Sequence, residues 1–282
     1  MICVNVVKDC DDTRFRTTLH YAAANGSVKV LKSLIEKGAD VNERCNLCKR
    51  TNGTPLHFAA RYNPNVEVLK CLVENGADVN VKDSNDNTSL HFASAYNNVE
   101  VVKYLIENGA DVNVKNDGKY TPLRYAAEFT RNVDIVKCLI EKGADAKNNI
   151  EQYPLLYFAV KNPNVDVVKY LTENVADANG PYRYDTPLLY LAANNPNVEI
   201  VKYLVKKGAD VNAKTAHGGA ALHCAAHHDT PNVEVLKFLI EKGADVNVKN
   251  DHGITPLDYA KGNREKEIIL RKAGGKSGKE LD

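Results

Sequence analysis

Residues 54–80 read TPLHFAARYNPNVEVLKCLVENGADVN, and this stretch decides the fold. Its beginning predicts a short helix. Thr54 can cap the helix N-terminus with its hydroxyl, and Pro55 suits the first helical position, where no amide donor is needed. The Asn-Pro-Asn sequence at 63–65 ends that helix, because proline removes a donor and disfavours helical backbone in the residue before it.

The remainder of the stretch predicts a second helix. Apolar residues recur on one face at helical spacing, and they are Val66, Leu69, Leu72 and Val73. Gly76 follows at the position where a left-handed residue ends a helix. The unit is therefore a helix, a turn, a second helix and an extended finger that leads to the next copy.

The same unit recurs along the whole chain at intervals of 32 to 37 residues. The copies begin at Thr17, Thr54, Thr88, Thr121, Tyr153, Thr186, Ala220 and Thr255. A period near 33 that carries T-P-L-H-x-A is typical of ankyrin repeats, and the chain resembles the ankyrin-repeat family over roughly its whole length. The resemblance implies an all-α fold: a solenoid of eight stacked helix-turn-helix units with β-turn or finger loops.

The repeats divide the chain into three segments. Residues 1–16 are interpreted as a finger-like lead-in, residues 17–273 as the repeat array, and residues 274–282 as a flexible tail. Because each unit buries its apolar face only against its neighbours, we expect a stack with no single central core.

Repeats five and six depart most from the pattern. Their fingers are short, and Val175 replaces the glycine that ends the other outer helices. A valine in that left-handed conformation would cost about 1–2 kcal/mol, so we expect this helix end to be remodelled. We also expect residues 147–186 to open before residues 54–113 in hydrogen exchange.

Composition limits the classes of partner and the compartment. The net charge of +1 over 282 residues does not favour nucleic acid or a membrane surface. Seven irregularly spaced cysteines indicate no disulfide framework and fit a reducing compartment. No apolar run reaches the roughly 20 residues that span a bilayer. We therefore expect a cytoplasmic monomer that binds protein, without nucleic acid or membrane insertion.

No residue pattern predicts a catalytic, cofactor-binding or metal site. The resemblance implies a structural role for the motif histidines His20, His57, His91 and His223, which brace the turn into each helix. Cys45 and Cys48 form C-x-x-C, but a structural zinc site needs about four ligands, and Cys10 in the preceding finger is the only further candidate. We interpret these cysteines as two exposed or half-buried thiols in a loop. The asparagine of each GADVN motif is expected to brace the finger backbone.

One pattern predicts a binding surface. The resemblance implies that partners contact the concave face formed by finger tips and inner helices. The inner-helix position two residues after the paired alanines is expected to look toward that face, and along the chain it reads Asn25, Tyr62, Tyr96, Phe129, Lys161, Asn194 and His228. Three consecutive repeats thus carry an aromatic residue at one slot, flanked by Arg61 and Glu128, and exposed aromatics are typical anchors. The alternative is that the rings stack on each other merely to cover the face.

The short fingers supply a second candidate cluster. It consists of Tyr153, Tyr182, Arg183 and Tyr184. Tyrosine and arginine dominate binding hot spots, so these residues are candidates for partner contact. Local repacking around the missing finger residues is an equally good interpretation.

Three functions follow as hypotheses. The first is a non-enzymatic scaffold that binds a protein partner through its concave groove, including an effector of a parasite, symbiont or virus acting in host cytosol. The alternative is a regulatory or targeting module within a larger enzyme or membrane protein. An enzyme would need clustered titratable groups in a pocket, and the sequence predicts none.

Overall fold

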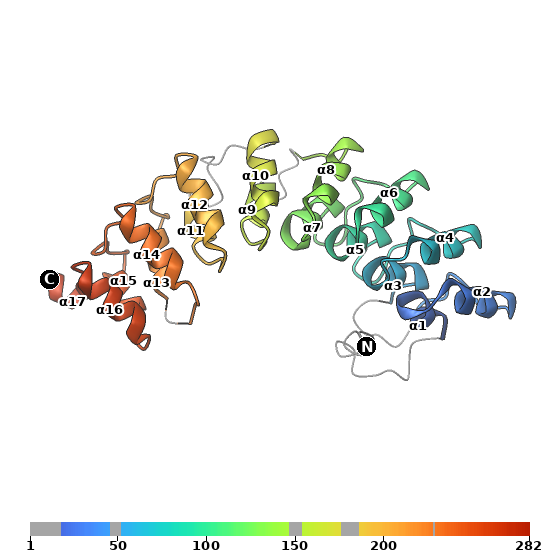
Figure 1. Cartoon of the computed structure of the whole chain (residues 1–282), viewed down its shortest axis with the longest axis horizontal. Coiled ribbons are helices and arrows are strands. Elements are labelled where there is room, and N and C mark those ends of the chain that lie inside the picture. The colour runs from blue at the N-terminus through green and yellow to red at the C-terminus, as the bar shows by residue number, and fades with distance from the viewer. Residues whose placement is uncertain (1–17, 46–51, 147–153, 176–185, 228) are drawn as a thin grey trace. The chain divides into compact units, whose positions relative to one another are not determined.

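The computed structural model describes residues 18–45, 52–146, 154–175, 186–227 and 229–282 (Figure 1). The chain forms two compact units, Met1–Ala146 and Lys147–Asp282. The helices of the first unit are α1 (Thr18–Asn25), α2 (Val28–Glu36), α3 (Pro55–Tyr62), α4 (Val66–Glu74), α5 (Ser89–Tyr96), α6 (Val99–Glu107), α7 (Pro122–Phe129) and α8 (Val133–Glu141). The helices of the second unit are α9 (Leu155–Ala159), α10 (Val165–Asn174), α11 (Leu188–Ala192), α12 (Val198–Lys206), α13 (Ala221–Ala226), α14 (Val233–Glu241), α15 (Pro256–Tyr259), α16 (Arg264–Lys272) and α17 (Gly278–Leu281).

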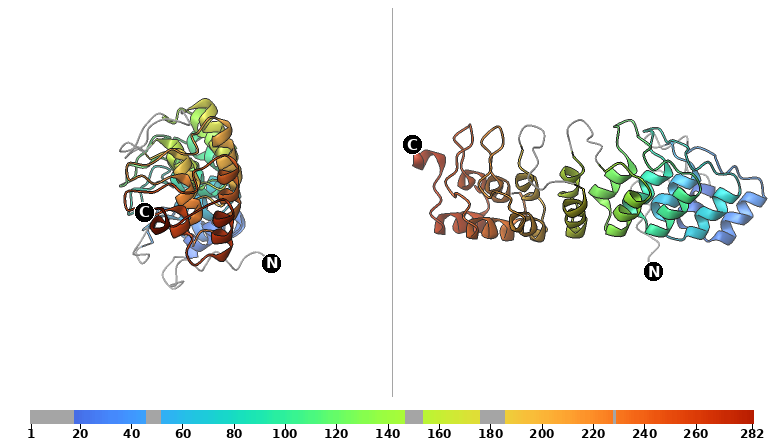
Figure 2. Two further views of the ribbon diagram at one scale, coloured as in Figure 1. Left: turned by 90° about the vertical axis from the view of Figure 1, so that its left-hand side faces the viewer. Right: turned by 90° about the horizontal axis from the view of Figure 1, so that it is seen from above.

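Each unit is a stack of helix pairs. In the first unit the inner helices α1, α3, α5 and α7 pack in one row, and the outer helices α2, α4, α6 and α8 pack in a second row (Figure 1). The connecting fingers extend from one side of the helices (Figure 2). The described residues contain an isolated antiparallel bridge between Lys214 and Ala220 but no longer strand. The second unit repeats this order, with α11, α13 and α15 in contact along its inner row.

Small and branched apolar side chains fill the space between the rows. Ala59 and Ala60 of α3 are fully buried, which lets neighbouring inner helices approach closely. Leu69 and Leu72 of α4 are also fully buried, on the face that the helical spacing predicts. The core is thus repeated in every helix pair, as expected for a stack.

The motif histidines tie each repeat to the next finger. His57 Nδ1 accepts the backbone N–H of Thr54 at 3.0 Å, so its proton lies on Nε2, which donates to the carbonyl of Asn87 at 3.1 Å. The bond to the following finger recurs in the pairs His20–Gly53, His91–Tyr120 and His223–Ile254. Burial lowers the pKa of His57 and of His91 to about 4, so both rings are neutral near pH 7. The expected structural role is confirmed.

The GADVN asparagines connect neighbouring fingers. Asn42 Nδ2 donates to the Gly76 carbonyl at 2.8 Å, and its Oδ1 accepts the Asp78 N–H at 3.1 Å. The same donor bond to the next closing glycine is made by Asn80, Asn113, Asn212 and Asn247. The expected bracing of the finger backbone is therefore confirmed, and each brace crosses from one repeat to the next.

The outer helix of repeat five ends differently from the others. Gly76 and its equivalents adopt φ near +90°, whereas Val175 has φ −130° and ψ −45°. Its N–H bonds to the Leu171 carbonyl at 2.9 Å. Valine thus avoids the left-handed region by a change of backbone conformation, and the predicted remodelling is confirmed.

Repeat five is expected to open before repeats two and three. Its inner helix α9 spans 5 residues, whereas α3 and α5 span 8 each. Pro154 at the α9 N-cap makes no side-chain cap hydrogen bond. Native-state hydrogen exchange should therefore show lower protection in α9 and α10 than in α3 to α6. Equal protection in these two groups of helices would contradict the prediction.

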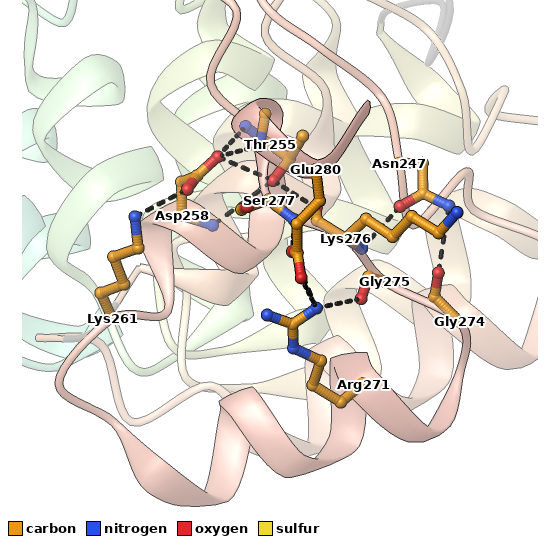
Figure 3. A network of polar contacts seen from close by, with 11 residues as sticks. Asn247, Thr255, Asp258, Lys261, Arg271, Gly274, Gly275, Lys276, Ser277 and Glu280 are labelled. Atoms are coloured by element: carbon orange, nitrogen blue, oxygen red, sulfur yellow. Dashed lines mark hydrogen bonds and ion pairs between the residues drawn. The ribbon is translucent and has the colours of Figure 1, made fainter. Parts of the chain in front are cut away.

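The C-terminal residues differ from the flexible tail that the sequence suggests. The glycine-rich composition of 274–282 is typical of disorder, but α17 docks onto repeat eight (Figure 3). Asp258 Oδ2 accepts the Gly278 N–H at 2.7 Å, and Arg271 pairs with Glu280 at 2.8 Å. A Cβ on Gly278 would collide with the Gly253 carbonyl, so glycine serves close approach at this position.

Candidate functional site

The aromatic surface of the first unit is centred on Tyr96 and Phe129. Tyr96 is the last residue of α5 and Phe129 the last of α7, and these inner helices are neighbours in the stack (Figure 1). Their side chains remain 48% and 39% exposed, and their rings stack with centroids 6.0 Å apart and an interplanar angle of 27°. The rings therefore touch each other and still present a shared apolar face to solvent.

Tyr62 occupies the same slot in α3 but is packed differently. It is half-buried and lies against a core cluster of Ala24, Cys45 and Phe58. Its ring centroid is 6.3 Å from that of Phe58. Of the three aromatics expected on the surface, Tyr62 thus belongs partly to the core, because the first finger places Cys45 beside it.

Arg61 lies between the rings of neighbouring inner helices. Its guanidinium carbon is 5.1 Å from the Tyr62 ring centroid, 5.1 Å from that of Tyr96 and 5.6 Å from that of Phe92. Contacts at this distance are cation–π interactions, worth about 0.5–2 kcal/mol each. We define the aromatic row as Arg61, Tyr62, Tyr96 and Phe129.

Glu128 flanks this row, but its carboxylate is already paired. Glu128 Oε2 lies 2.7 Å from Arg124 on the same face of α7, and both side chains are largely buried. The Arg124 guanidinium carbon is 3.9 Å from the Tyr120 ring centroid. Arg124 stands where other repeats carry the motif histidine, so the ion pair is specific to repeat four. Glu128 is therefore held along its own helix rather than directed at a partner.

The remaining sequence-predicted residues fall outside the aromatic row. Lys161 and Asn194 are exposed in the second unit, where Lys161 Nζ lies 4.6 Å from the Tyr157 ring centroid. Five candidates lie outside the described residues: His228, Tyr153, Tyr182, Arg183 and Tyr184. The same holds for Cys48. Cys45 is buried, packed with Ala24 and Phe58, so the expectation of an exposed or half-buried thiol is wrong at this position. No group of three or more possible metal ligands occurs among the described residues.

Two rings of the site were missed by the sequence analysis. The Phe92 ring contacts the Arg61 guanidinium. Tyr125 contacts Phe129 edge-on, with ring centroids 6.0 Å apart. Both lie four residues before an aromatic of the slot, which places them one turn away on the same helix. The i, i+4 spacing of aromatic residues in α5 and α7 could have indicated that these rings belong to the same surface.

The stacked helix pairs and finger loops define the class as a helical repeat solenoid. A family model for ankyrin repeats matches residues 19–116, 56–150, 113–182, 156–250 and 189–271. The crystal structure of the human ASB11 ankyrin repeat domain is similar to this chain, with a TM-score of 0.68 and 31% sequence identity. That match covers 79% of this chain and 99% of the human domain. The chain belongs to the ankyrin-repeat family.

Membership of the ankyrin-repeat family supports a general role in protein binding. Ankyrin repeats are generally protein–protein interaction modules and are typically non-enzymatic. A comparison with curated protein sequences returned no match. Among the described helices, none is long and apolar enough to cross a membrane.

Proposed function

We propose that this protein is a non-enzymatic binding module whose protein partner contacts the aromatic row of the first unit. The observation that carries the proposal is the Tyr96–Phe129 stack, which stays exposed although the neighbouring rings of Phe58 and Phe92 are buried. Large rings offer contact area with few rotors to immobilise, so a partner gains burial at a low entropic cost. A monomeric protein has little other reason to keep adjacent aromatics in water.

Replacing Tyr96 and Phe129 together with alanine is expected to weaken partner binding without unfolding the chain. Truncation of an aromatic anchor costs about 2 kcal/mol or more, which corresponds to about thirtyfold in affinity. Affinity capture from the native cell with quantitative mass spectrometry identifies partners that bind the parent chain. Titration calorimetry with the purified partner then measures the loss.

The matched control is Tyr104→Ala, which removes a partly buried aromatic from the outer helix α6 of the same unit. Tyr104→Ala should leave partner affinity within about twofold, because the residue lies away from the inner row. Tyr62→Ala should reduce stability as well as affinity, because Tyr62 packs on the core cluster. Equal affinity of the parent and the Tyr96/Phe129 variant for every partner would exclude this surface as the site.

A further inference from the structure

Arg61 carries a charge that no residue of the described chain neutralises. Its contacts are the rings of Tyr62, Phe92 and Tyr96, and no ion pair or hydrogen bond of its side chain is formed with the described residues. The side chain is nevertheless half-buried. Partial removal of a guanidinium from water without an anion is unfavourable, so a group that supplied the anion would be favoured at this position.

Among the described inner helices of the first unit, Arg61 is the charged side chain that has no ion-pair partner. In helices α1, α3, α5 and α7, the charged side chains are Arg61, Arg124 and Glu128. Arg124 and Glu128 neutralise each other at 2.7 Å. These four helices together thus carry one uncompensated positive charge. It lies directly beside the exposed Tyr96–Phe129 stack.

The rings also fix the position of that charge. Aromatic faces on several sides hold the planar guanidinium, which reduces the rotamer entropy lost when it binds an anion. An arginine held in this way can offer two parallel N–H donors to one carboxylate. Tyr96 joins this cation to Phe129, so the charged and apolar parts of the surface are contiguous.

We propose that the aromatic row recognises an acidic–apolar segment of the partner protein, with an aspartate or glutamate carboxylate on Arg61 and a neighbouring apolar side chain on the Tyr96–Phe129 stack. This inference rests on the proposed function, because it assumes that the row is the binding surface. A carboxylate fits better than a phosphate. One guanidinium balances one monoanionic group, whereas a phosphorylated residue carries a charge of about −1.5 to −2 and is received by clusters of cations.

The test uses the full chain and a displayed library of random 16-residue peptides. Selection on the parent chain should enrich peptides with an acidic residue next to an apolar one. The best peptide, labelled with fluorescein, is then titrated by anisotropy against the parent, Arg61→Gln, Arg61→Lys and Tyr96→Ala/Phe129→Ala. A second peptide replaces its acidic residue with the matching amide, and a third replaces it with phosphoserine.

For the parent chain, the amide peptide should bind about tenfold to a hundredfold more weakly than the acidic one, the range expected for a charge-assisted hydrogen bond. In Arg61→Gln the two peptides should bind alike, and Arg61→Lys should recover only part of the difference because lysine lacks the planar fork. Lys202→Gln, an exposed cation on α12 of the second unit, is the control and should leave the difference unchanged. Circular dichroism verifies that each variant is folded.

The outcomes separate the two proposals. The carboxylate assignment would be overturned if the peptides bind Tyr96→Ala/Phe129→Ala more weakly but bind Arg61→Gln as tightly as the parent. The aromatic row would then remain the proposed binding surface. Peptides indifferent to both sets of variants would overturn the surface itself. Tighter binding of the phosphoserine peptide would replace the carboxylate with a phosphate. A selection that enriches no acidic–apolar peptide would overturn the recognition of such a segment.

Discussion

Val68→Asp is expected to destabilise the first unit by about 4 kcal/mol or more, whereas Val30→Asp at the corresponding position of repeat one should cost less than about 1 kcal/mol. Val68 is fully buried in α4, and Val30 in α2 is 49% exposed. The same outer-helix position is fully buried in every later repeat up to Val235. Val68 lies in α4, which packs against α2 of the preceding repeat, and this nearest-neighbour packing explains its burial.

The comparison of Val68→Asp with Val30→Asp is informative because both variants make the same substitution at the same position of an outer helix. A carboxylate at Val68 would have to leave water without a partner, whereas at Val30 it would remain hydrated. Urea denaturation monitored by far-UV circular dichroism gives the shift of the midpoint. A milder Val68→Ala variant supplies a second value that is expected to lie between the two. Similar midpoints for Val68→Asp and Val30→Asp would show that nearest-neighbour burial does not dominate stability.

Acidification from pH 7 to pH 5 is expected to remove about 4 kcal/mol of stability from repeats two and three. Burial lowers the pKa of His57 and His91 to about 4, against about 6.5 in the unfolded chain. Between these values the unfolded state binds more protons, so stability is complete above pH 6.5 and is lost as the pH falls toward 4. At pH 5 the difference amounts to about 2 kcal/mol for each ring.

The structural reason is that both ring nitrogens are already engaged. Nδ1 of His91 accepts the Thr88 N–H at 3.1 Å, so protonation there would remove an acceptor and leave two donors facing each other. The positive charges of Arg44 near His57 and of Lys82 near His91 oppose protonation further. Asp83 acts in the opposite sense, because burial raises its pKa and the folded chain takes up that proton first.

Native-state hydrogen exchange of α3 and α5 amides at pH 7, 6 and 5, corrected for intrinsic rates, measures this loss. The double variant His57→Gln/His91→Gln should be less stable at pH 7 but nearly insensitive to pH between 7 and 5. His252→Gln, which alters an exposed histidine, should retain the full pH dependence of the parent. A change below about 1 kcal/mol in the parent chain over this interval would refute the assignment of buried neutral rings.

The sequence alone could predict much of the fold because the determining signals are local and repeated. Thr54, Pro55 and the Asn-Pro-Asn break define helix boundaries through backbone constraints that act over a few residues. The departure at Val175 was also predictable, because a β-branched residue disfavours the left-handed conformation wherever it occurs. The order of residues 274–282 was not, because Gly278 serves a close approach to Gly253 that composition does not reveal.

The candidate site was only partly predictable for a related reason. The slot position of Tyr96 and Phe129 follows from helical periodicity, and both are exposed as expected. The same periodicity could not distinguish Tyr62, whose burial depends on Cys45 of a different finger. The Arg124–Glu128 pair has i, i+4 spacing on α7 and was predictable from that periodicity. That Arg61 is left without an anion was not.

By itself, the sequence determined the number and period of the helix pairs, the residues that end them, and the bracing role of the motif histidines and asparagines. These features depend on contacts at a constant sequence separation, so a single motif specifies them in every copy. The tertiary structure alone decided which aromatic rings remain in water, which rings surround Arg61 and how α17 docks. Those outcomes depend on contacts between separate helices and loops, which the period of a single helix does not specify.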